Sequence, residues 1–412
     1  MIIIFTPREY RCQLFFLLLT TIIVLIYSRK RSAFRAPLLQ EKGSIRLSLP
    51  SAVPKRRFAA LPSGKAGFAL LQLLLAGFTL LSVGIAVSLG QVDVPLGQSF
   101  QILAHRLTGL TFGDSADILS GPNANIIWTI RFPRVLLALL VGAGLSLCGT
   151  IMQASVQNPL ADPYILGISS GASLGATFSI MIGFGAGGVL GQLGLAFWAF
   201  AGAVGASVLV LALSGIGSRM TSAKLVLSGM VIHALCTAFA NSIIYFANNT
   251  EGIRTVTFWT MGSLAAAKWD RLPLVAAAVV LAALFFLLQS RILNTMLLGE
   301  EAAVTLGVNL NRHRRFYLIA TALLTGVLVS SCGMIGFVGL IIPHMVRAGV
   351  GSDHRRLLPL SIWAGGLFLI WTDIIARTAI PKVELPIGII TALIGAPLFM
   401  YMLLKKGYEF GG

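Results

Sequence analysis

Charged residues are scarce in this chain. They make up 11% of its 412 residues, which is less than half of the ~25% that soluble globular domains carry. Hydrophobic residues make up 56%, and the mean hydropathy is +0.88. The length alone would allow about two or three soluble domains, but this composition excludes them and indicates a polytopic membrane protein.

Cysteine is equally scarce, and the whole chain holds Cys12, Cys148, Cys236 and Cys332. All of them lie in apolar surroundings, and no two have a short paired spacing. Cysteines of this kind are typical small packing residues. Neither a disulfide framework nor a cysteine-based metal site is therefore predicted.

The motifs of several enzyme classes are absent. The nearest match to a phosphate-binding loop is Ser63-Gly64-Lys65-Ala66, which lacks the first glycine and the final hydroxyl of that motif. No H-E-x-x-H, C-x-x-C or paired-carboxylate cluster occurs either. The sequence therefore predicts no catalytic residue, no metal ligand and no cofactor bound by this chain.

Charges are almost missing from the middle of the apolar segments, where an ion-coupled carrier would be expected to hold some. Two histidines do lie in such segments, His233 and His344, and either could handle protons or a metal. Lone histidines there are more often hydrogen-bonded packing residues, and the sequence favours that interpretation.

Basic charge is concentrated at the amino terminus. The net charge of +17 could suggest nucleic acid, but residues 1–67 hold 12 of the 31 Lys/Arg residues and only 2 of the 14 Asp/Glu residues. We therefore expect no nucleic-acid partner and assign residues 1–66 to a basic extension. Its apolar run, residues 14–27, is short for a membrane span of about 20 residues. The run could be an extra anchor helix, an interfacial segment, or part of an extension from a wrongly chosen start codon, which is slightly favoured.

The remaining body, residues 67–408, holds regularly spaced apolar runs separated by polar, Pro or Gly residues. These runs predict ten transmembrane helices in an all-α polytopic membrane protein. The runs are Phe68–Leu89, Val135–Ser155, Ile165–Ile182, Leu193–Ile216, Leu225–Ala247, Leu272–Leu288, Phe316–Val329, Met334–Val350, Leu358–Ala376 and Ile387–Leu404.

Orientation follows from the Lys/Arg residues of the connecting segments, because cytoplasmic loops carry an excess of them. The loops on one side of the body hold 11 and those on the other side hold 8. This difference is small, but the basic extension adds to the richer side. Both ends of the body are therefore predicted to face the cytoplasm.

A polar island, residues 291–315, separates two of the apolar runs on the cytoplasmic side. Gly299 and Gly307 are natural breaks that would divide it into two short helices. Glu300 and Glu301 would then lie in the first turn of the second helix, where the helix dipole favours acidic groups. Apolar residues could share one face of both helices, namely Met296, Leu297, Ala302, Ala303, Leu306 and Val308. The residues alone leave two interpretations open, a surface that binds a partner outside the membrane and a solvated connector.

Arginines mark the outer side of the body. Arg131 and Arg134 open the second run, and Asp373 is spaced to pair with Arg377 on one helix face at the end of the ninth. Such arginines are commonly anchors at the membrane surface, but they could instead receive acidic residues of a soluble partner. The residues alone favour the anchor.

Small residues recur every fourth position in the second and third runs, which predicts closely packed helices rather than a ligand site. The positions include Gly142 in the second run and Gly167, Gly171 and Gly175 in the third. The eighth run is interrupted by Gly336, Gly339 and Pro343. Interrupted helices are tolerated where protein or a cavity surrounds them, so this run is predicted to line the interior.

Many short motifs occur together in a fixed order along the body. They are Arg131-Phe-Pro-Arg134, Gly144, Gln153, Asn158-Pro-Leu-Ala161, Leu166-Gly167, Gly171-Ala172, Trp259-Thr-Met-Gly262, Leu298-Gly299-Glu300, Ala303, Leu306-Gly307, Gly336-Phe-Val-Gly-Leu340, Pro343-His344, Arg347, Asp373, Arg377, Glu384-Leu-Pro-Ile-Gly388 and Gly395-Ala-Pro397. Over roughly residues 68 to 408 the chain resembles the FecCD family of ABC-importer permeases, which handle ferric siderophores, haem and vitamin B12.

The resemblance implies the type II ABC-importer permease fold, with ten helices in each subunit of a dimer that is usually a homodimer in the inner membrane. It also implies two cytoplasmic ATPases, which use ATP and Mg, and a soluble or lipid-anchored substrate-binding protein. The residues implied for ATPase coupling are Leu298, Gly299, Glu300, Glu301, Ala303, Leu306 and Gly307. Those implied for docking of the binding protein are Arg131, Arg134 and Arg377.

The resulting expectation is an ATP-driven, alternating-access importer subunit with no chemistry of its own. Ferric siderophore is the expected cargo, followed by haem and then cobalamin. The alternative is an ion-coupled secondary transporter acting without an ATPase. A membrane-embedded enzyme would need convergent titratable residues, and the sequence shows none.

Overall fold

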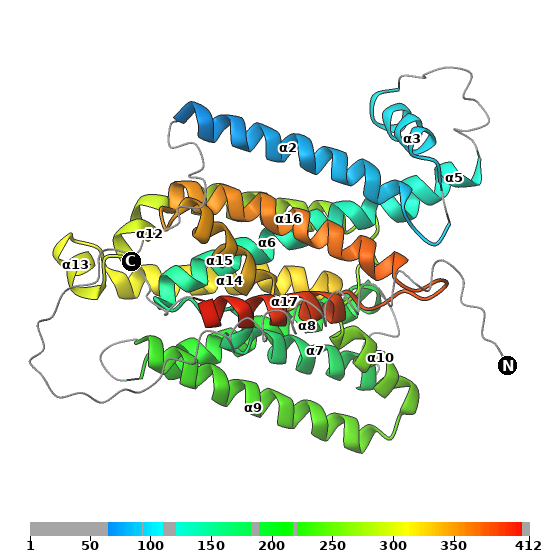
Figure 1. Ribbon diagram of the computed structural model, residues 1–412. Helices are drawn as coiled ribbons and strands as arrows, with labels where there is room; N and C mark the ends of the chain where they lie inside the picture. Colours follow the sequence, from blue (N-terminus) through cyan, green and yellow to red (C-terminus); the bar gives the residue numbers. More distant parts are fainter. Residues whose placement is uncertain (1–64, 93, 110–120, 183–188, 217–220, 406–412) are drawn as a thin grey trace, which may run out of the picture. The chain divides into compact units, whose positions relative to one another are not determined.

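The computed structural model describes residues 65–92, 94–109, 121–182, 189–216 and 221–405. The apolar run 14–27 and nearly all of the basic extension lie outside these residues. The described residues fold as helices joined by short loops (Figure 1). The helices are α2 (Lys65–Ser88), α3 (Leu96–Thr108), α5 (Pro122–Asn125), η1 (Ile126–Arg131), α6 (Phe132–Val156), η2 (Pro163–Leu166), α7 (Ile168–Ile182), α8 (Val189–Ser214), α9 (Ser222–Ala247), α10 (Thr250–Thr260), α11 (Leu272–Leu288), α12 (Ser290–Met296), α13 (Glu300–Thr305), α14 (Leu310–Cys332), α15 (Val338–Val350), α16 (His354–Thr378) and α17 (Ile387–Lys405).

Each predicted apolar run coincides with one of these helices. Among the described residues, 6 helices are long and apolar enough to cross a membrane, and α11 and α12, which are bent by 62° relative to each other, add a seventh span if the pair crosses as one. The three remaining runs correspond to the shorter apolar helices α7, α15 and α17. The all-helical membrane architecture is thus confirmed, with six clear candidate spans, whereas the number of ten crossings stays a prediction.

Polar side chains at the helix ends explain where several helices begin. The first backbone N–H groups of a helix have no partner within it, so a side-chain oxygen just before them stabilises the start. Asp353 accepts from the N–H of Arg355 (3.0 Å) at the start of α16, and Asn309 accepts from the N–H of Arg312 (3.1 Å) at the start of α14. Both helices begin at the end of the bundle that carries α12 and α13 (Figure 1).

Helix α6 lies at the centre of the bundle and packs against α11, α14, α15 and α16. Nearly all of its residues are buried. The approach to its neighbours is close because the backbones meet at glycines. A Cβ at Gly142 would overlap the carbonyl of Gly365 in α16, and a Cβ at Gly149 would overlap the backbone of Gly339 in α15. Larger side chains at these positions would force the helices apart.

Helices α7 and α8 meet in the same way. A Cβ on Gly171 would overlap the carbonyl of Gly202, and a Cβ on Gly175 would overlap the carbonyl of Trp198. Gly167 has a different role, because it ends η2 with a φ of +75°, which is strained for other residues. The predicted small-residue stripe of the third run therefore combines two close contacts with one turn.

The interrupted eighth run contains both buried and open positions. Gly339 and Pro343 are buried in α15, and Gly339 is the residue that α6 approaches. Gly336 precedes α15, and a Cβ there would meet no atom within 4 Å. A side chain would therefore fit at Gly336, before α15, but not at Gly339 within the helix.

We predict that Gly175→Ala lowers the stability of the subunit by about 1–3 kcal/mol, because the added methyl overpacks the contact between α7 and α8. Gly205→Ala is the matched control, since a Cβ at Gly205 in α8 meets no atom within 4 Å. Thermal unfolding in detergent measures both variants. Equal melting temperatures for the two would contradict the close contact at Gly175.

Candidate functional site

The polar island forms two short helices at one end of the bundle. The chain bends by 62° between α11 and α12, and α13 follows after a short turn (Figure 1). Gly299 has a φ of +97° and Gly307 a φ of +80°, so both turns use a backbone conformation that favours glycine. Glu300 and Glu301 open α13, which confirms their predicted place in its first turn.

The apolar residues of this segment do not share one face, contrary to the prediction. Met296 and Ala303 are buried, whereas Leu306 is exposed at 63%. The turn at Gly299 changes the direction of the chain, so α12 and α13 do not continue one helical register. The segment consequently has an inner side that packs on the subunit and an outer side that exposes Leu298, Val304 and Leu306.

Hydrogen bonds fix the inner side of α12 to the ends of two other helices. The Gln157 side chain, at the end of α6, donates to the carbonyl of Met296 (2.5 Å). Arg314 of α14 is buried and donates to the carbonyl of Ser155 (3.0 Å) and to the side-chain oxygen of Gln157 (3.3 Å). The carboxyl end of α6, the first turns of α14 and the end of α12 therefore form one connected unit.

Asn294 joins α12 to the start of α16. Its amide donates to Asp353 (2.6 Å), and its oxygen accepts from the backbone N–H of His354 (2.8 Å). Partial burial opposes ionisation of Asp353, but hydrogen bonds from the Arg355 N–H and from Asn294 outweigh it and lower the pKa of this carboxyl below its ordinary value. Asp353 therefore stays ionised near neutral pH and holds Asn294 in place.

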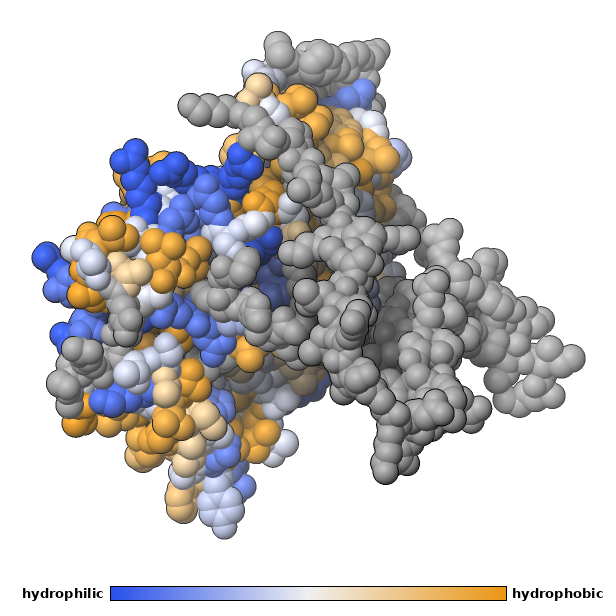
Figure 2. Space-filling model, turned by 60° about the vertical axis from the view of Figure 1, so that its left-hand side comes forward, coloured by the Kyte–Doolittle hydropathy of each residue, from blue (hydrophilic) through white to orange (hydrophobic). Residues whose placement is uncertain are grey.

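The outer surface of this end mixes apolar and charged groups. Leu298, Val304 and Leu306 are exposed, and so are Arg291 and Arg312 of the same segment. Figure 2, which brings this end of the molecule forward, shows hydrophobic patches interspersed with hydrophilic ones. A surface that mixes exposed apolar and charged residues suits contact with another protein better than contact with lipid tails.

A second polar cluster lies at the opposite end of the bundle. Arg134 pairs with Asp373 (3.0 Å) and with Glu384 (2.8 Å), and Arg377 pairs with the other oxygen of Asp373 (2.9 Å). The predicted pair of Asp373 and Arg377 within one helix is thereby confirmed. The Asp373 side chain is 1% exposed, whereas that of Glu384 is 43% exposed.

Arg131 and Arg377 also donate to the carboxyl end of α2. The last carbonyl groups of a helix have no partner within it and carry partial negative charge, so arginines stabilise them. The accepting oxygens belong to Val87 (3.0 Å) and Ser88 (2.6 Å) for Arg131, and to Ala86 (3.1 Å) and Leu89 (3.0 Å) for Arg377.

All three arginines predicted to dock a binding protein are therefore buried and engaged within the subunit. Their guanidinium groups join α2, η1, α6 and α16. Together with Asp373 and Glu384 they leave this cluster with one excess positive charge. Docking through these arginines stays a prediction, and the acidic group exposed beside them is Glu384.

Gln91 is a residue of this end that sequence reasoning did not single out. Its side chain donates to the carbonyl of Arg377 (2.7 Å) and accepts from the N–H of Lys382 (2.7 Å). Lys382 has a φ of +62°, so Gln91 closes a tight turn. No signal in the sequence links residues so far apart, and only the fold brings them together.

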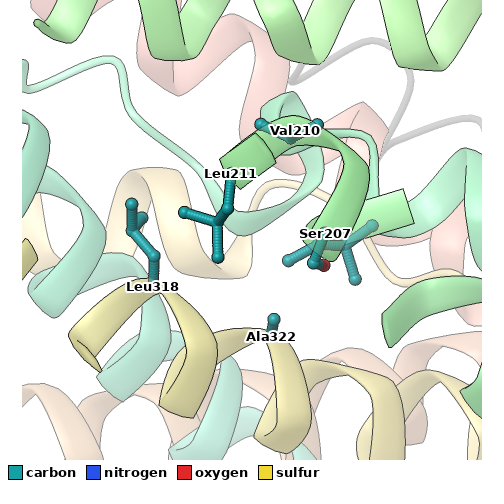
Figure 3. A pocket seen from close by; sticks show the side chains of 6 residues that line it. Ser207, Val210, Leu211, Leu318 and Ala322 are labelled. Carbon is teal, nitrogen blue, oxygen red and sulfur yellow. The ribbon is translucent and has the colours of Figure 1, made fainter. Parts of the chain in front are cut away.

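One small pocket lies between α8 and α14 (Figure 3). It has room for about one water molecule, so it is a gap in the packing rather than a path for a large cargo. The lining residues are Ile168, Ser207, Val210, Leu211, Leu318 and Ala322.

Helix α9 has an exposed face unlike those of other candidate spans. On α2 the exposed large side chains in mid-helix are apolar, as at Leu73 and Leu80, and the exposed sides of α8 and α11 are apolar too. On α9 the exposed side also carries apolar residues, among them Leu235 and Phe239, but His233, Thr237 and Asn241 are exposed as well and follow one another at four-residue spacing. Polar groups at that depth face water or protein rather than lipid.

Within this subunit, His233 is not the hydrogen-bonded packing residue that the sequence favours. Its side chain is exposed, and no hydrogen bond joins it to another described residue. The sequence could not show that His233 is exposed, because both the buried and the exposed residues of α9 are mostly apolar. Within the described residues, no three His, Cys, Asp or Glu side chains come together to hold a metal ion.

Comparison with known proteins gives a consistent result. Residues 76–405 match the model of the FecCD transport family. The chain is 39% identical over 287 residues to the hemin transport system permease protein HmuU of Yersinia pestis, covering 69% of this chain and 85% of HmuU. It is 38% identical over 340 residues to the cobalamin import system permease protein BtuC of Halobacterium salinarum, covering 80% of this chain and 89% of BtuC.

A solved structure shares the fold. It is described as a metal-chelate type ABC transporter in an inward-facing conformation, and it superposes with a TM-score of 0.70 at 30% sequence identity. The alignment covers 82% of this chain and 100% of that chain.

We predict that Asp373→Asn destabilises the subunit by about 3–5 kcal/mol, because two buried arginines lose their shared carboxylate. Glu384→Gln, the control at the exposed partner, should change the free energy of unfolding by less than about 1 kcal/mol. Thermal unfolding of the purified subunit compares the two. A loss in Asp373→Asn no greater than in Glu384→Gln would show that the buried pair does not hold this end together.

Proposed function

The chain belongs to the FecCD transport family, and on this premise we propose that it is the permease subunit of a binding-protein-dependent ABC importer that moves a metal chelate inward across the inner membrane. The observation that carries the proposal is the segment of α12 and α13. It lies at one end of the bundle, is held on its inner side by α6, α14 and α16, and exposes apolar residues on its outer side.

The proposed topology has ten crossings. The six clear spans, the bent pair of α11 and α12, and the short helices α7, α15 and α17 supply them. With this topology α12 and α13 lie on the cytoplasmic side, as the distribution of Lys and Arg predicts. The cluster around Asp373 then lies on the outer side.

The proposed partners at the cytoplasmic end are two ATPase subunits, which bind ATP and Mg themselves. Leu298 and Leu306 would enter a pocket of the ATPase, while Asn294, Gln157 and Arg314 transmit its movement to the bundle. These connections reach α6 and α16, which run to the opposite end. Closing and opening of the ATPases would thereby drive alternating access.

At the outer end we place the soluble or lipid-anchored binding protein. Because Arg131, Arg134 and Arg377 are buried, they would hold the helix ends of the docking surface in place. The excess positive charge of the cluster would attract acidic side chains of the binding protein. An acidic residue of the partner could compete with Glu384, whose side chain is 43% exposed, for Arg134.

The second permease subunit is proposed to be another copy of this chain, placed along α9. The exposed polar residues His233, Thr237 and Asn241 support a water-filled path there. Ferric siderophore is the cargo that family breadth favours, followed by haem and cobalamin. The named relatives concern the latter two.

An ion-coupled carrier is not favoured. Such a carrier places ionisable residues near the middle of its spans. In the described part of the chain, the Asp, Glu, Lys and Arg residues of the candidate spans lie toward helix ends, as Arg134 and Arg314 do.

We predict that Leu306→Ser weakens assembly with the ATPase by about tenfold, as expected for the loss of roughly 1.4 kcal/mol of apolar contact. Leu107→Ser is the matched control, because Leu107 is 61% exposed at the opposite end of the bundle and Leu306 is 63% exposed. Co-purification of the ATPase with each variant measures the effect. Equal recovery with both variants would refute the proposed binding of the ATPase by α12 and α13.

We also predict that cysteines at positions 233, 237 and 241 react with a charged, membrane-impermeant thiol reagent. Cysteines at positions 73 and 80 of α2 are the controls, because these residues lie on an apolar exposed face. The reaction is followed in a background without native cysteines. Equally slow labelling at both sets of positions would place α9 against lipid and reject the proposed path.

A further inference from the structure

We propose that His233 determines cargo specificity by presenting its imidazole to the metal of the passing cargo. It would favour metal macrocycles with an exchangeable axial position, such as haem or a corrinoid, over chelates that fill all six positions of the iron, and so it reverses the order of cargoes that family breadth gives. This inference rests on the proposed function, because it assumes that cargo moves along α9.

The position of His233 places it deep in the membrane. Helix α9 has 26 residues, Ser222–Ala247, and His233 lies near its middle, about 17 Å from its first residue and about 21 Å from its last at 1.5 Å per residue. The hydrocarbon core is about 30 Å thick, so the imidazole cannot reach the lipid headgroups. An exposed imidazole at this depth needs water, protein or cargo as its partner.

The ring is available for a ligand. No hydrogen bond joins His233 to another described residue, so neither ring nitrogen is occupied within the subunit. Met230 lies one turn earlier on α9 and is 60% exposed. Three-residue spacing puts the two side chains next to each other on the helix surface.

The chemistry of these two side chains points to a particular class of cargo. Histidine nitrogen and methionine sulfur are both axial ligands of haem iron in proteins. In a macrocycle the ring supplies four ligands, so a bound water can leave and the imidazole lone pair can take its place. The oxidation state of the metal does not change. A hexadentate siderophore leaves no position for this exchange.

Ferric haem is the probe that tests the contact directly. It is titrated into the complete importer in lipid nanodiscs, with wild type, His233→Ala and His105→Ala compared. His105 is a half-buried histidine of α3 that is not on α9. We expect the Soret band to shift to that of histidine-ligated ferric haem in wild type and His105→Ala, and the shift to be lost in His233→Ala. Metal-free protoporphyrin, which has no axial position, should bind equally to all three.

ATP-dependent uptake of ferric haem, aquocobalamin and a hexadentate ferric hydroxamate chelate is then measured in the same variants. His233→Ala should reduce uptake of haem or aquocobalamin by about tenfold, equivalent to 1.4 kcal/mol, and His233→Met should restore part of it. An unchanged haem spectrum in His233→Ala, or uptake of the hydroxamate chelate alone, would overturn this inference and leave the importer standing. Absence of any ATP-dependent uptake by wild type would overturn the importer assignment and this inference with it.

Discussion

The close approach of α6 to α15 and α16 is the constraint on which the rest of the structure depends. Lipid tails are as apolar as leucine side chains, so membrane helices associate through van der Waals contact at small residues. Gly142 and Gly149 provide that contact in α6. The helix can therefore lie at the centre of the bundle, with α16 beside it from one polar end to the other (Figure 1).

This pair of helices connects the two polar ends of the subunit. At one end, α6 and α16 share the ion pair of Arg134 and Asp373. At the other, α6 ends at Gln157 and α16 begins at His354, and both residues hydrogen-bond to α12. A permease must transmit movement from an ATPase to its outer face, and a tightly packed pair with fixed ends is suited to that task.

The sequence predicted the helices well, because long apolar runs and helix-capping residues are local signals. It also identified the arginines of the outer end and the glycine turns of α12 and α13. It could not predict that the buried Arg134 pairs with Glu384, since 250 residues separate them. Nor could it find the exposed face of His233, because exposure depends on which neighbouring helices cover α9. The prediction of one apolar face across α12 and α13 was wrong because the turn at Gly299 breaks the helical register between them.

The central claim is that ATP hydrolysis by a partner drives inward transport of a metal chelate through this subunit. The most direct measurement is uptake of labelled haem, cobalamin and ferric siderophore into proteoliposomes that contain the subunit with its ATPase and binding protein. The account predicts accumulation of at least one cargo that requires ATP and persists when ionophores collapse every ion gradient. Accumulation without the ATPase that disappears with the ion gradient would contradict it.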